Sequence, residues 1–171
     1  MKKYFLFTSI LLFFILFISC EKVNKTGDLT WTLKNGTLTI SGQGAMPNYA
    51  DAYNTNDAPW GKNDRLNITN IIINEGITNI GDNAFINLIN VVAVSLPDTL
   101  TNIGKNSFKN CSGLTLISIP NGVINIGDSA FQGCNNLIQV ILSSSPLNID
   151  KSAFEDCGKL IQKKTRRYAM V

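Results

Sequence analysis

LTLISIPNGVINIGDSAFQGC, residues 114–134, decides the fold of this chain, because its pattern recurs with a 23-residue period. The recurring positions are mostly apolar, as expected for repeats that bury one shared core. Three such columns are Ile80, Ile103, Ile126 and Ile149; Phe85, Phe108, Phe131 and Phe154; and Cys111, Cys134 and Cys157, with Leu88 in the equivalent first place. Two more are Ile71, Val94, Ile117 and Val140, and Ile73, Leu96, Ile119 and Leu142. So many columns in one phase indicate a repeat protein.

Each repeat predicts one short β-strand and one short helix. Val94 and Leu96 are two positions apart, which indicates a strand with one buried face. Ala130, Phe131 and Cys134 are spaced by three and four, which predicts a turn or two of helix with these side chains on one face. A unit this short cannot close a core alone, so stacked units form a solenoid in which each touches only its neighbours.

A glycine precedes each predicted helix. We expect a bend there that uses a positive φ, which a residue without a Cβ adopts most easily. The three glycines are Gly81, Gly104 and Gly127, and Asp150 takes the fourth place.

A β-hairpin precedes the repeats. Residues 29–33 and 38–42 alternate in polarity around Lys34-Asn35-Gly36, a strong hairpin signal. We expect this hairpin to cap the N-terminal end of the solenoid, shielding the first coil from water and from strand addition.

The pattern of residues 114–134 resembles the repeat of BspA-like leucine-rich-repeat proteins. The resemblance extends to the opening segment, through Thr30-Trp31-Thr32-Leu33, residues 36–42, Gly44-Ala45-Met46 and Ala58-Pro59-Trp60. It implies a leucine-rich-repeat solenoid, and an extracellular or cell-surface protein of a family in which some members are adhesins for host matrix proteins or for other microbes.

The chain divides into five segments on these patterns. They are a lipoprotein signal peptide (1–19), a linker (20–28), an N-terminal β cap with an Asn/Asp-rich loop (29–66), the solenoid (67–161) and a basic tail (162–171). Lys163 and Thr165 fall where the next core residues would be, so the repeat stops there. Three interpretations stay open: the tail covers the last coil, the edge at 140–142 accepts a partner strand, or the chain is a truncated, degenerate relative.

The N-terminus predicts export and lipid anchoring. Lys2 and Lys3 precede an apolar run over residues 4–18, which is shorter than the ~20 residues that a helix needs to span a bilayer. Residues 17–20, Phe-Ile-Ser-Cys, resemble the bacterial lipobox, in which Cys20 becomes the acylated N-terminus. We therefore expect a lipid-anchored protein of the outer membrane or cell surface.

The outward positions of the predicted strands form the candidate ligand-binding face. They are uncharged and mildly apolar, which suits contact with an extracellular protein or glycan, including host matrix, although an inert scaffold face has the same composition. The candidate residues are Ile72, Ala93, Ser95, Leu116, Ser118, Gln139 and Ile141, with Asn70 beside them.

The cysteine and asparagine columns are predicted to be structural. Residues in one column project in parallel, at least one coil apart, whereas disulfides need Cβ atoms ~3.5–4.5 Å apart and zinc ligands must converge. We expect buried free thiols at 111, 134 and 157, and a ladder of amides along Asn79, Asn102, Asn125 and Asn148.

Enzymatic and nucleic-acid-binding roles are not indicated. The chain contains no His, which removes Ser-His and Cys-His nucleophile pairs, and no phosphate-binding glycine loop. The loop from Asn48 to Asp64 is rich in oxygen ligands but lacks the EF-hand spacing, so we expect a surface insertion pinned by Trp60, without metal or cofactor. Without residues 1–19 the formal charge falls from +3 to +1, which implies no nucleic-acid partner.

The sequence therefore predicts a non-enzymatic adhesion module that binds through its sheet face. The competing prediction is a structural or self-assembling surface protein, including an edge-strand homodimer, or a degenerate relative without binding activity.

Overall fold

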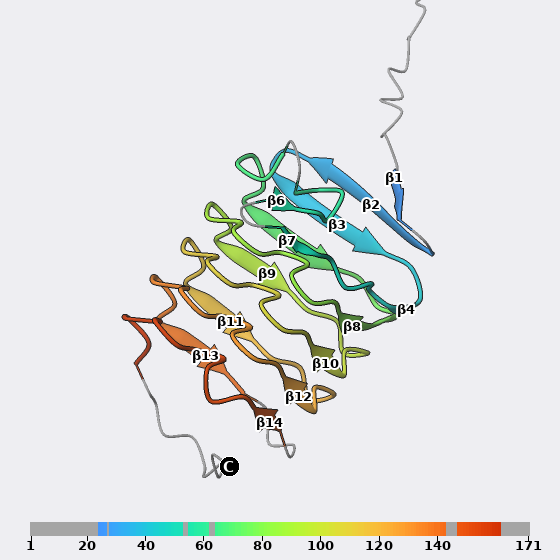
Figure 1. Ribbon diagram of the computed structural model, residues 1–171. Helices are drawn as coiled ribbons and strands as arrows, with labels where there is room; N and C mark the ends of the chain where they lie inside the picture. Colours follow the sequence, from blue (N-terminus) through green and yellow to red (C-terminus); the bar gives the residue numbers. More distant parts are fainter. Residues whose placement is uncertain (1–23, 27, 53–54, 62–63, 143–146, 162–171) are drawn as a thin grey trace, which may run out of the picture.

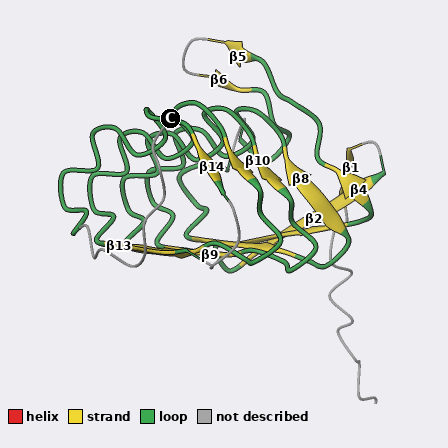
Figure 2. Cartoon of the chain, turned by 90° about the horizontal axis from the view of Figure 1, so that it is seen from below, coloured by secondary structure: helices red, strands yellow, loops and turns green. Residues whose placement is uncertain are grey.

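The computed structural model describes residues 24–26, 28–52, 55–61, 64–142 and 147–161. In these residues the chain winds as a series of coils that advance from the N-terminal hairpin to the last strands, and strands on two sides of the coils lie in order (Figure 1). Seen from below, one side is a nearly flat sheet and the opposite side consists of loops and turns (Figure 2). The described residues include no helix long and apolar enough to cross a membrane.

The first sheet begins with the N-terminal hairpin. β2 (Leu29–Lys34) and β3 (Thr37–Ser41) pair antiparallel around Asn35 and Gly36, as predicted. Both turn residues have positive φ, 48° and 78°, as expected for a two-residue hairpin turn. β1 (Asn24–Thr26) adds an antiparallel edge strand inside the segment that we assigned to a linker.

The repeat strands continue this sheet in parallel. β3 pairs with β7 (Asn70–Ile73), and β7 pairs with β9 (Ala93–Ser95). β11 (Leu116–Ser118) and β13 (Gln139–Ile141) form a separate parallel pair, which lies beside β9 (Figure 1). Partners such as Ile71 and Val94 are separated by one full period, so the strand register reproduces the repeat of the sequence.

A second sheet runs along another side of the coils, which the sequence analysis did not predict. It contains β4 (Gly44–Ala45), β8 (Ile77–Ile80), β10 (Asn102–Ile103), β12 (Asn125–Ile126) and β14 (Asn148–Ile149), all in parallel. Two short strands, β5 (Asp51–Ala52) and β6 (Thr55–Asn56), pair within the Asn/Asp-rich loop. Each repeat therefore contributes two strands, one to each sheet. Ile103 and its equivalents pair through their backbones in the second sheet, and their side chains point into the core.

The predicted short helices are wrong, because the described residues contain none and these segments are successive turns. The backbone N–H of Phe108 donates to Ala130 O of the next coil (2.8 Å). In the same way, Phe85 N donates to Ser107 O and Phe131 N donates to Ala153 O. Asn106 and Asn110 have φ of 52° and 60°, a left-handed conformation that asparagine tolerates and that interrupts a helix. Bonds between coils thus alternate with local turn bonds three residues apart, such as Lys109 N to Asn106 O (3.1 Å).

The reason given for the regular spacing of the glycines was also wrong. Gly81, Gly104 and Gly127 are not among the residues with positive φ. They are needed for close approach instead: a Cβ on Gly104 would lie 2.7 Å from Ile80 O, and one on Gly127 would lie 3.0 Å from Lys105 N. Both contacts are with the neighbouring coil, so a side chain here would push the coils apart.

The core is a continuous column that contains a stack of rings. Phe85, Phe108 and Phe131 are fully buried, and neighbouring ring centroids are 5.1 and 5.2 Å apart. Phe154 extends the stack by 5.2 Å and is only half-buried because it belongs to the last described coil. The structure places the aromatic column, which we assigned to the repeat core, inside the stacked coils.

Candidate functional site

The predicted ligand face is the outer side of the first sheet together with the β11–β13 pair beside it, and these are called the first sheet from here on. Ile72, Leu116 and Ile141 are 39 %, 44 % and 44 % exposed, although each is a large aliphatic residue. The remaining predicted positions, Ala93, Ser95, Ser118 and Gln139, are also exposed, and Asn70 is half-buried. The structure therefore places the whole predicted set on one surface.

The strand register brings these residues together in pairs. Ile72 lies beside Ser95 on β7 and β9, and Asn70 lies beside Ala93. Leu116 lies beside Gln139 and Ser118 beside Ile141 on β11 and β13. Neighbouring strands are ~4.8 Å apart, so each aliphatic side chain has a polar neighbour across the strands.

The hairpin continues both columns of this face. Thr37 and Thr39 on β3 pair with Asn70 and Ile72, and Lys34 on β2 pairs with Thr37. Lys34 is thus the one charged side chain in the two described outward columns. This surface carries hydroxyls, amides and half-exposed aliphatic groups, which can bind a ligand by shape and hydrogen bonds but not by charge.

Charged residues gather instead on the turn side of the coils. One further column with the 23-residue spacing consists of charged residues of alternating sign, Asp82, Lys105, Asp128 and Lys151. Lys105 Nζ is 2.7 Å from Asp128 Oδ2, and this contact, with the Ser152 hydroxyl, lowers the pKa of Asp128 to about 2. Both side chains are about half exposed (57 % and 45 %), so the pair stabilises the stack only weakly.

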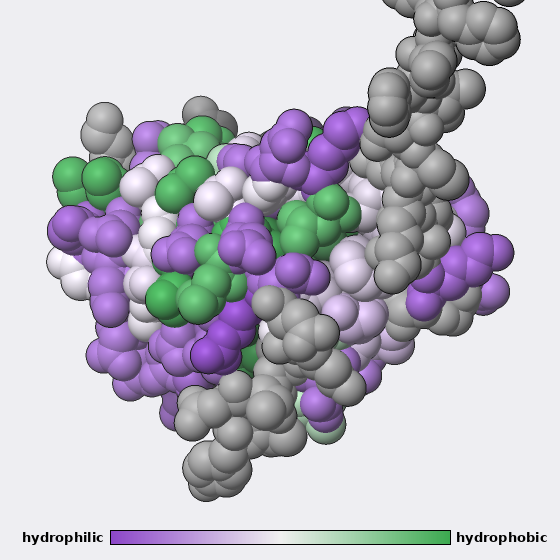
Figure 3. Space-filling view, turned by 90° about the horizontal axis from the view of Figure 1, so that it is seen from above, coloured by the Kyte–Doolittle hydropathy of each residue, from purple (hydrophilic) through white to green (hydrophobic). Residues whose placement is uncertain are grey.

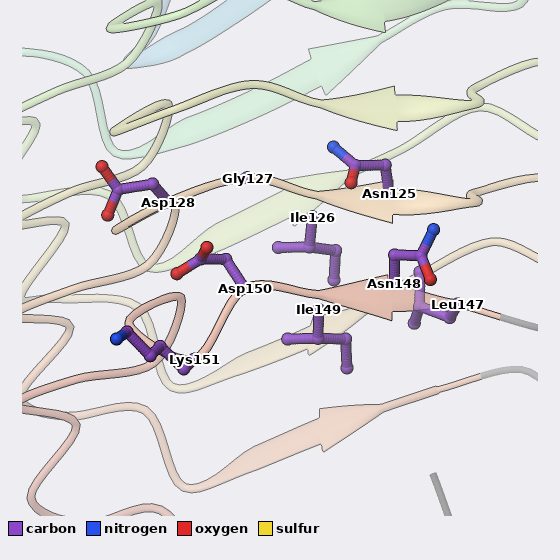
Figure 4. A pocket seen from close by; sticks show the side chains of 9 residues that line it. All are labelled: Asn125, Ile126, Gly127, Asp128, Leu147, Asn148, Ile149, Asp150 and Lys151. Carbon is purple, nitrogen blue, oxygen red and sulfur yellow. The ribbon is translucent and has the colours of Figure 1, made fainter. Parts of the chain in front are cut away.

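A shallow depression lies at the last described coil. It has a volume of about 510 Å³, between β12 and β14. Figure 4 shows Ile126 and Ile149 one above the other, with Asp128, Asp150 and Lys151 at the end of the strands. It includes no residue of the predicted face. Its ionisable groups, Asp128, Asp150 and Lys151, belong to the charge column or lie next to it.

The cysteines of the repeat column lie among the core residues. Cys111 and Cys134 are fully buried, Cys157 is half-buried, and all three are free thiols. Each thiol donates to a phenylalanine carbonyl of the preceding coil, at 3.2 Å for Cys111 to Phe85 O and 3.3 Å for Cys134 to Phe108 O. Burial raises the pKa of the Cys111 thiol to about 12 and also raises the pKa of Cys134 and Cys157. These groups are poor nucleophiles at neutral pH.

Three of the four residues in the predicted asparagine ladder, Asn79, Asn102 and Asn125, are joined by side-chain hydrogen bonds along the second sheet, and Asn148 follows Asn125 in the strand register. Asn102 Nδ2 donates to Asn79 Oδ1, and Asn125 Nδ2 donates to Asn102 Oδ1 (2.8 Å). Two further ladders were missed: Asn106 donates to Asn83 (3.1 Å) and Asn110 to Asn87 (2.8 Å). Their 23-residue spacing was visible in the sequence, but the positions were assigned to helices, whose outward side chains do not meet in this way.

Trp60 has a larger role than the predicted pinning of a loop. It is fully buried, stacks on Phe85 with centroids 5.5 Å apart, and donates from Nε1 to Ala84 O (2.9 Å). Trp31 and Tyr49 contact it edge-on at 6.2 and 5.5 Å. The 23-residue spacing of the phenylalanines places the preceding ring at position 62, whereas the tryptophan is residue 60. The period therefore did not reveal that Trp60 is the first ring of the column.

Three predicted features lie outside the described residues. These are the signal peptide of residues 1–19, the lipidation residue Cys20 and the basic tail of residues 162–171. Among the residues that the structure describes, no group of three or more His, Cys, Asp or Glu side chains is arranged to hold a metal ion.

Comparison with known proteins agrees with this architecture. The family model of the BspA type leucine-rich repeat region matches residues 63–166 in six copies. A leucine-rich repeat protein from Eubacterium ventriosum has a similar fold, with a TM-score of 0.52 and 24 % identity over 71 % of this chain and 43 % of that one. This chain thus spans less than half of that relative.

Two further solved structures are more distant. A leucine-rich repeat protein from T. pallidum has a TM-score of 0.48 and 19 % identity, over 82 % of this chain and 80 % of that one. A leucine-rich cell surface protein from Faecalibacterium prausnitzii has a TM-score of 0.40 and 19 % identity, over 82 % and 53 %. No curated protein matches this chain. The 23-residue register, the paired sheets and the match over residues 63–166 together establish that the chain belongs to the BspA-type leucine-rich-repeat family.

Proposed function

We propose that the protein is a non-enzymatic, exported surface lipoprotein that binds an extracellular protein or glycan through the outer face of its first sheet. The observation that carries this proposal is the composition of that face. Ile72, Leu116 and Ile141 stay 39–44 % exposed among polar neighbours, although inward positions on the same strands reach zero exposure at Ile117. Half-exposed aliphatic groups in regular rows are typical of contact surfaces, which exclude water only when a partner covers them.

A non-enzymatic role is supported by the chemistry available. The chain contains no histidine, and the described cysteines are buried or half-buried with raised pKa values. The ionisable groups of the turn side, such as Lys105 and Asp128, pair with each other and lie half exposed. None of these is placed as a nucleophile with its base.

The test is a binding assay with two matched variants. The full chain, purified in detergent, is applied to an array of matrix proteins and glycans beside the Ser95→Lys, Ser118→Lys variant, which adds two charges to the face. The control, Thr101→Lys with Ile124→Lys, adds the same charge one coil apart at exposed positions that precede β10 and β12. We expect the face variant to lose binding and the control to keep it. Equal binding by both variants would exclude the sheet face.

Lipid anchoring through Cys20 is the second part of the proposal. The lipobox-like residues 17–20 support it. Radiolabelled palmitate is expected to enter the wild-type chain and not the Cys20→Ala variant. Label in both chains would place acylation elsewhere, and label in neither would remove the anchor from the proposal.

Self-assembly is the alternative, and the position of β13 favours it. β13 pairs on one side with β11, and no other described strand pairs with it. In this alternative, the other edge of β13 pairs with a second chain through its backbone donors and acceptors. A concentration-dependent dimer in sedimentation that Ile141→Pro abolishes and Ile141→Ala preserves would support this role. A monomer without ligands on the array would indicate a degenerate relative.

A further inference from the structure

We infer that the protein stands edge-on to the membrane, with β1 nearest the lipid and the ligand face of β11 and β13 held away from it. This inference rests on the proposed acylation of Cys20. It assigns the lipid-facing surface to the hairpin end of the first sheet, and it orients the whole array with respect to the bilayer.

The length of the tether carries the first step. β1 begins at Asn24, a few positions after Cys20. A tether of about four residues spans at most about 14 Å even when fully extended. Asn24 is fixed in register opposite Trp31 of β2, so this tether ends on the sheet itself and not on a loose segment. The edge strand of the first sheet therefore stays within this short reach of the acylated residue.

The order of strands carries the second step. From β2 the first sheet continues through β3, β7 and β9, and β11 and β13 follow beside them (Figure 1). Neighbouring strands are ~4.8 Å apart, so five strand steps place β13 about 24 Å beyond β2. Because the anchor holds one edge, the opposite edge is the part of the described array that is farthest from it.

The third argument is the composition of the surfaces. The sheet face lacks the residues that would hold the protein flat on a bilayer. Surfaces that lie in the lipid interface combine basic residues with large apolar groups. Beyond Lys34, the two described outward columns contain no charge, so they lack the row of basic residues that a surface flat on an anionic bilayer carries. At the hairpin end, Lys25 and Lys34 are exposed together with Asp28, and the excess of basic side chains attracts anionic headgroups.

The hairpin end is suited to lie at a headgroup surface and not to insert. Seen from this end, hydrophobic side chains lie in separate groups among hydrophilic ones (Figure 3). The contact with the bilayer is thus made by the acyl anchor and by lysine side chains. The binding residues Leu116, Ser118, Gln139 and Ile141 then project from the membrane-distal strands, within reach of an external partner.

Energy transfer to labelled lipids tests the orientation. Single cysteines replace Thr37 or Gln139 in a Cys157→Ala background, since the buried Cys111 and Cys134 thiols react slowly. Thr37 and Gln139 occupy the same outward column and differ in their strand, so each label is the matched control for the other. Lys25 and Lys34 stay in place in both chains. The acylated chains are placed in vesicles of phosphatidylcholine and phosphatidylglycerol with an acceptor on the headgroup.

We expect transfer from the Thr37→Cys label to be several-fold greater than transfer from the Gln139→Cys label. Equal transfer would mean that the sheet lies along the bilayer, and greater transfer at 139 would mean the opposite orientation; either result overturns the inference. Vesicle binding of the acylated wild type and its loss in Cys20→Ala are measured in the same experiment. Failure of the anchor is thereby distinguished from failure of the orientation, and the array assay tests ligand binding independently.

Discussion

Trp60 stacks on Phe85, with ring centroids 5.5 Å apart and 23° between the ring planes. The loop that precedes the repeats is thereby joined to the phenylalanine column, and its indole N–H satisfies the carbonyl of Ala84. Trp60 covers Phe85 at the N-terminal end of the core, as Phe85 covers Phe108 one coil further along.

Trp60→Ala is therefore expected to destabilise the whole array by about 3–5 kcal/mol, the usual cost of removing a fully buried aromatic side chain. Urea unfolding measures the change. Phe154→Ala is the matched comparison, because Phe154 is half-buried at the far end of the stack. We expect a smaller loss there. A loss at Trp60 no greater than at Phe154 would contradict the place of Trp60 at the head of the column.

Gly104→Ala is expected to destabilise the fold although Gly104 does not have a positive φ. The new methyl group would meet Ile80 O at 2.7 Å and force two coils apart, at a cost of about 1–3 kcal/mol. Gly158→Ala serves as the control, because a Cβ there has no neighbour within 4 Å. Thermal unfolding of the two variants should separate them, and similar melting temperatures would argue against close packing at Gly104.

Ser107→Ala is expected to stabilise the protein by about 1 kcal/mol. The Ser107 hydroxyl is fully buried and has no hydrogen-bond partner among the described residues. The equivalent positions in the other coils are Ala84, Ala130 and Ala153, so the cavity already fits a methyl group. Denaturant unfolding should show a higher midpoint with an unchanged slope. A lower midpoint would mean that the hydroxyl is satisfied in solution.

Stability is expected to fall above pH 9 because of the buried thiols. Burial raises the pKa of Cys111 from 9.0 to about 12, so the unfolded chain releases this proton at lower pH than the folded chain does. The contribution is fully present below pH 9 and is lost as the pH rises toward 12. Unfolding free energies measured from about pH 7 to about pH 10.5 should decline less in a Cys111→Ala, Cys134→Ala variant than in the wild type. An equal decline in both chains would assign the pH dependence to other groups.

Native alkylation provides a separate test of the same burial. Under mildly alkaline conditions, iodoacetamide should modify Cys157 before Cys111 and Cys134, because Cys157 is only half-buried. Peptide mapping after timed labelling identifies the modified residue. Rapid modification of Cys111 under native conditions would be inconsistent with a fully buried thiol.

The sequence alone determined the period, the inward columns and the outward face. Residues such as Phe108, Ile117 and Cys111 are spaced by the repeat, and apolar columns at constant spacing bury one another when the coils stack. The hairpin at Asn35-Gly36 was equally accessible, since its turn chemistry is local. The placement of Ser95 and Ser118 outside followed from the two-residue alternation of a strand.

The tertiary structure decided how each coil is closed. Spacings of three and four among Ala130, Phe131 and Cys134 fit a helix and a run of turns equally well. The choice depends on where the backbone N–H groups bond, and here Phe108 N finds Ala130 O on the next coil. The second sheet and the stacking of Trp60 on Phe85 also depend on contacts between adjacent coils. Local sequence specifies which residues are buried, but only the adjacent coil supplies the hydrogen-bond partners that select turns over helix.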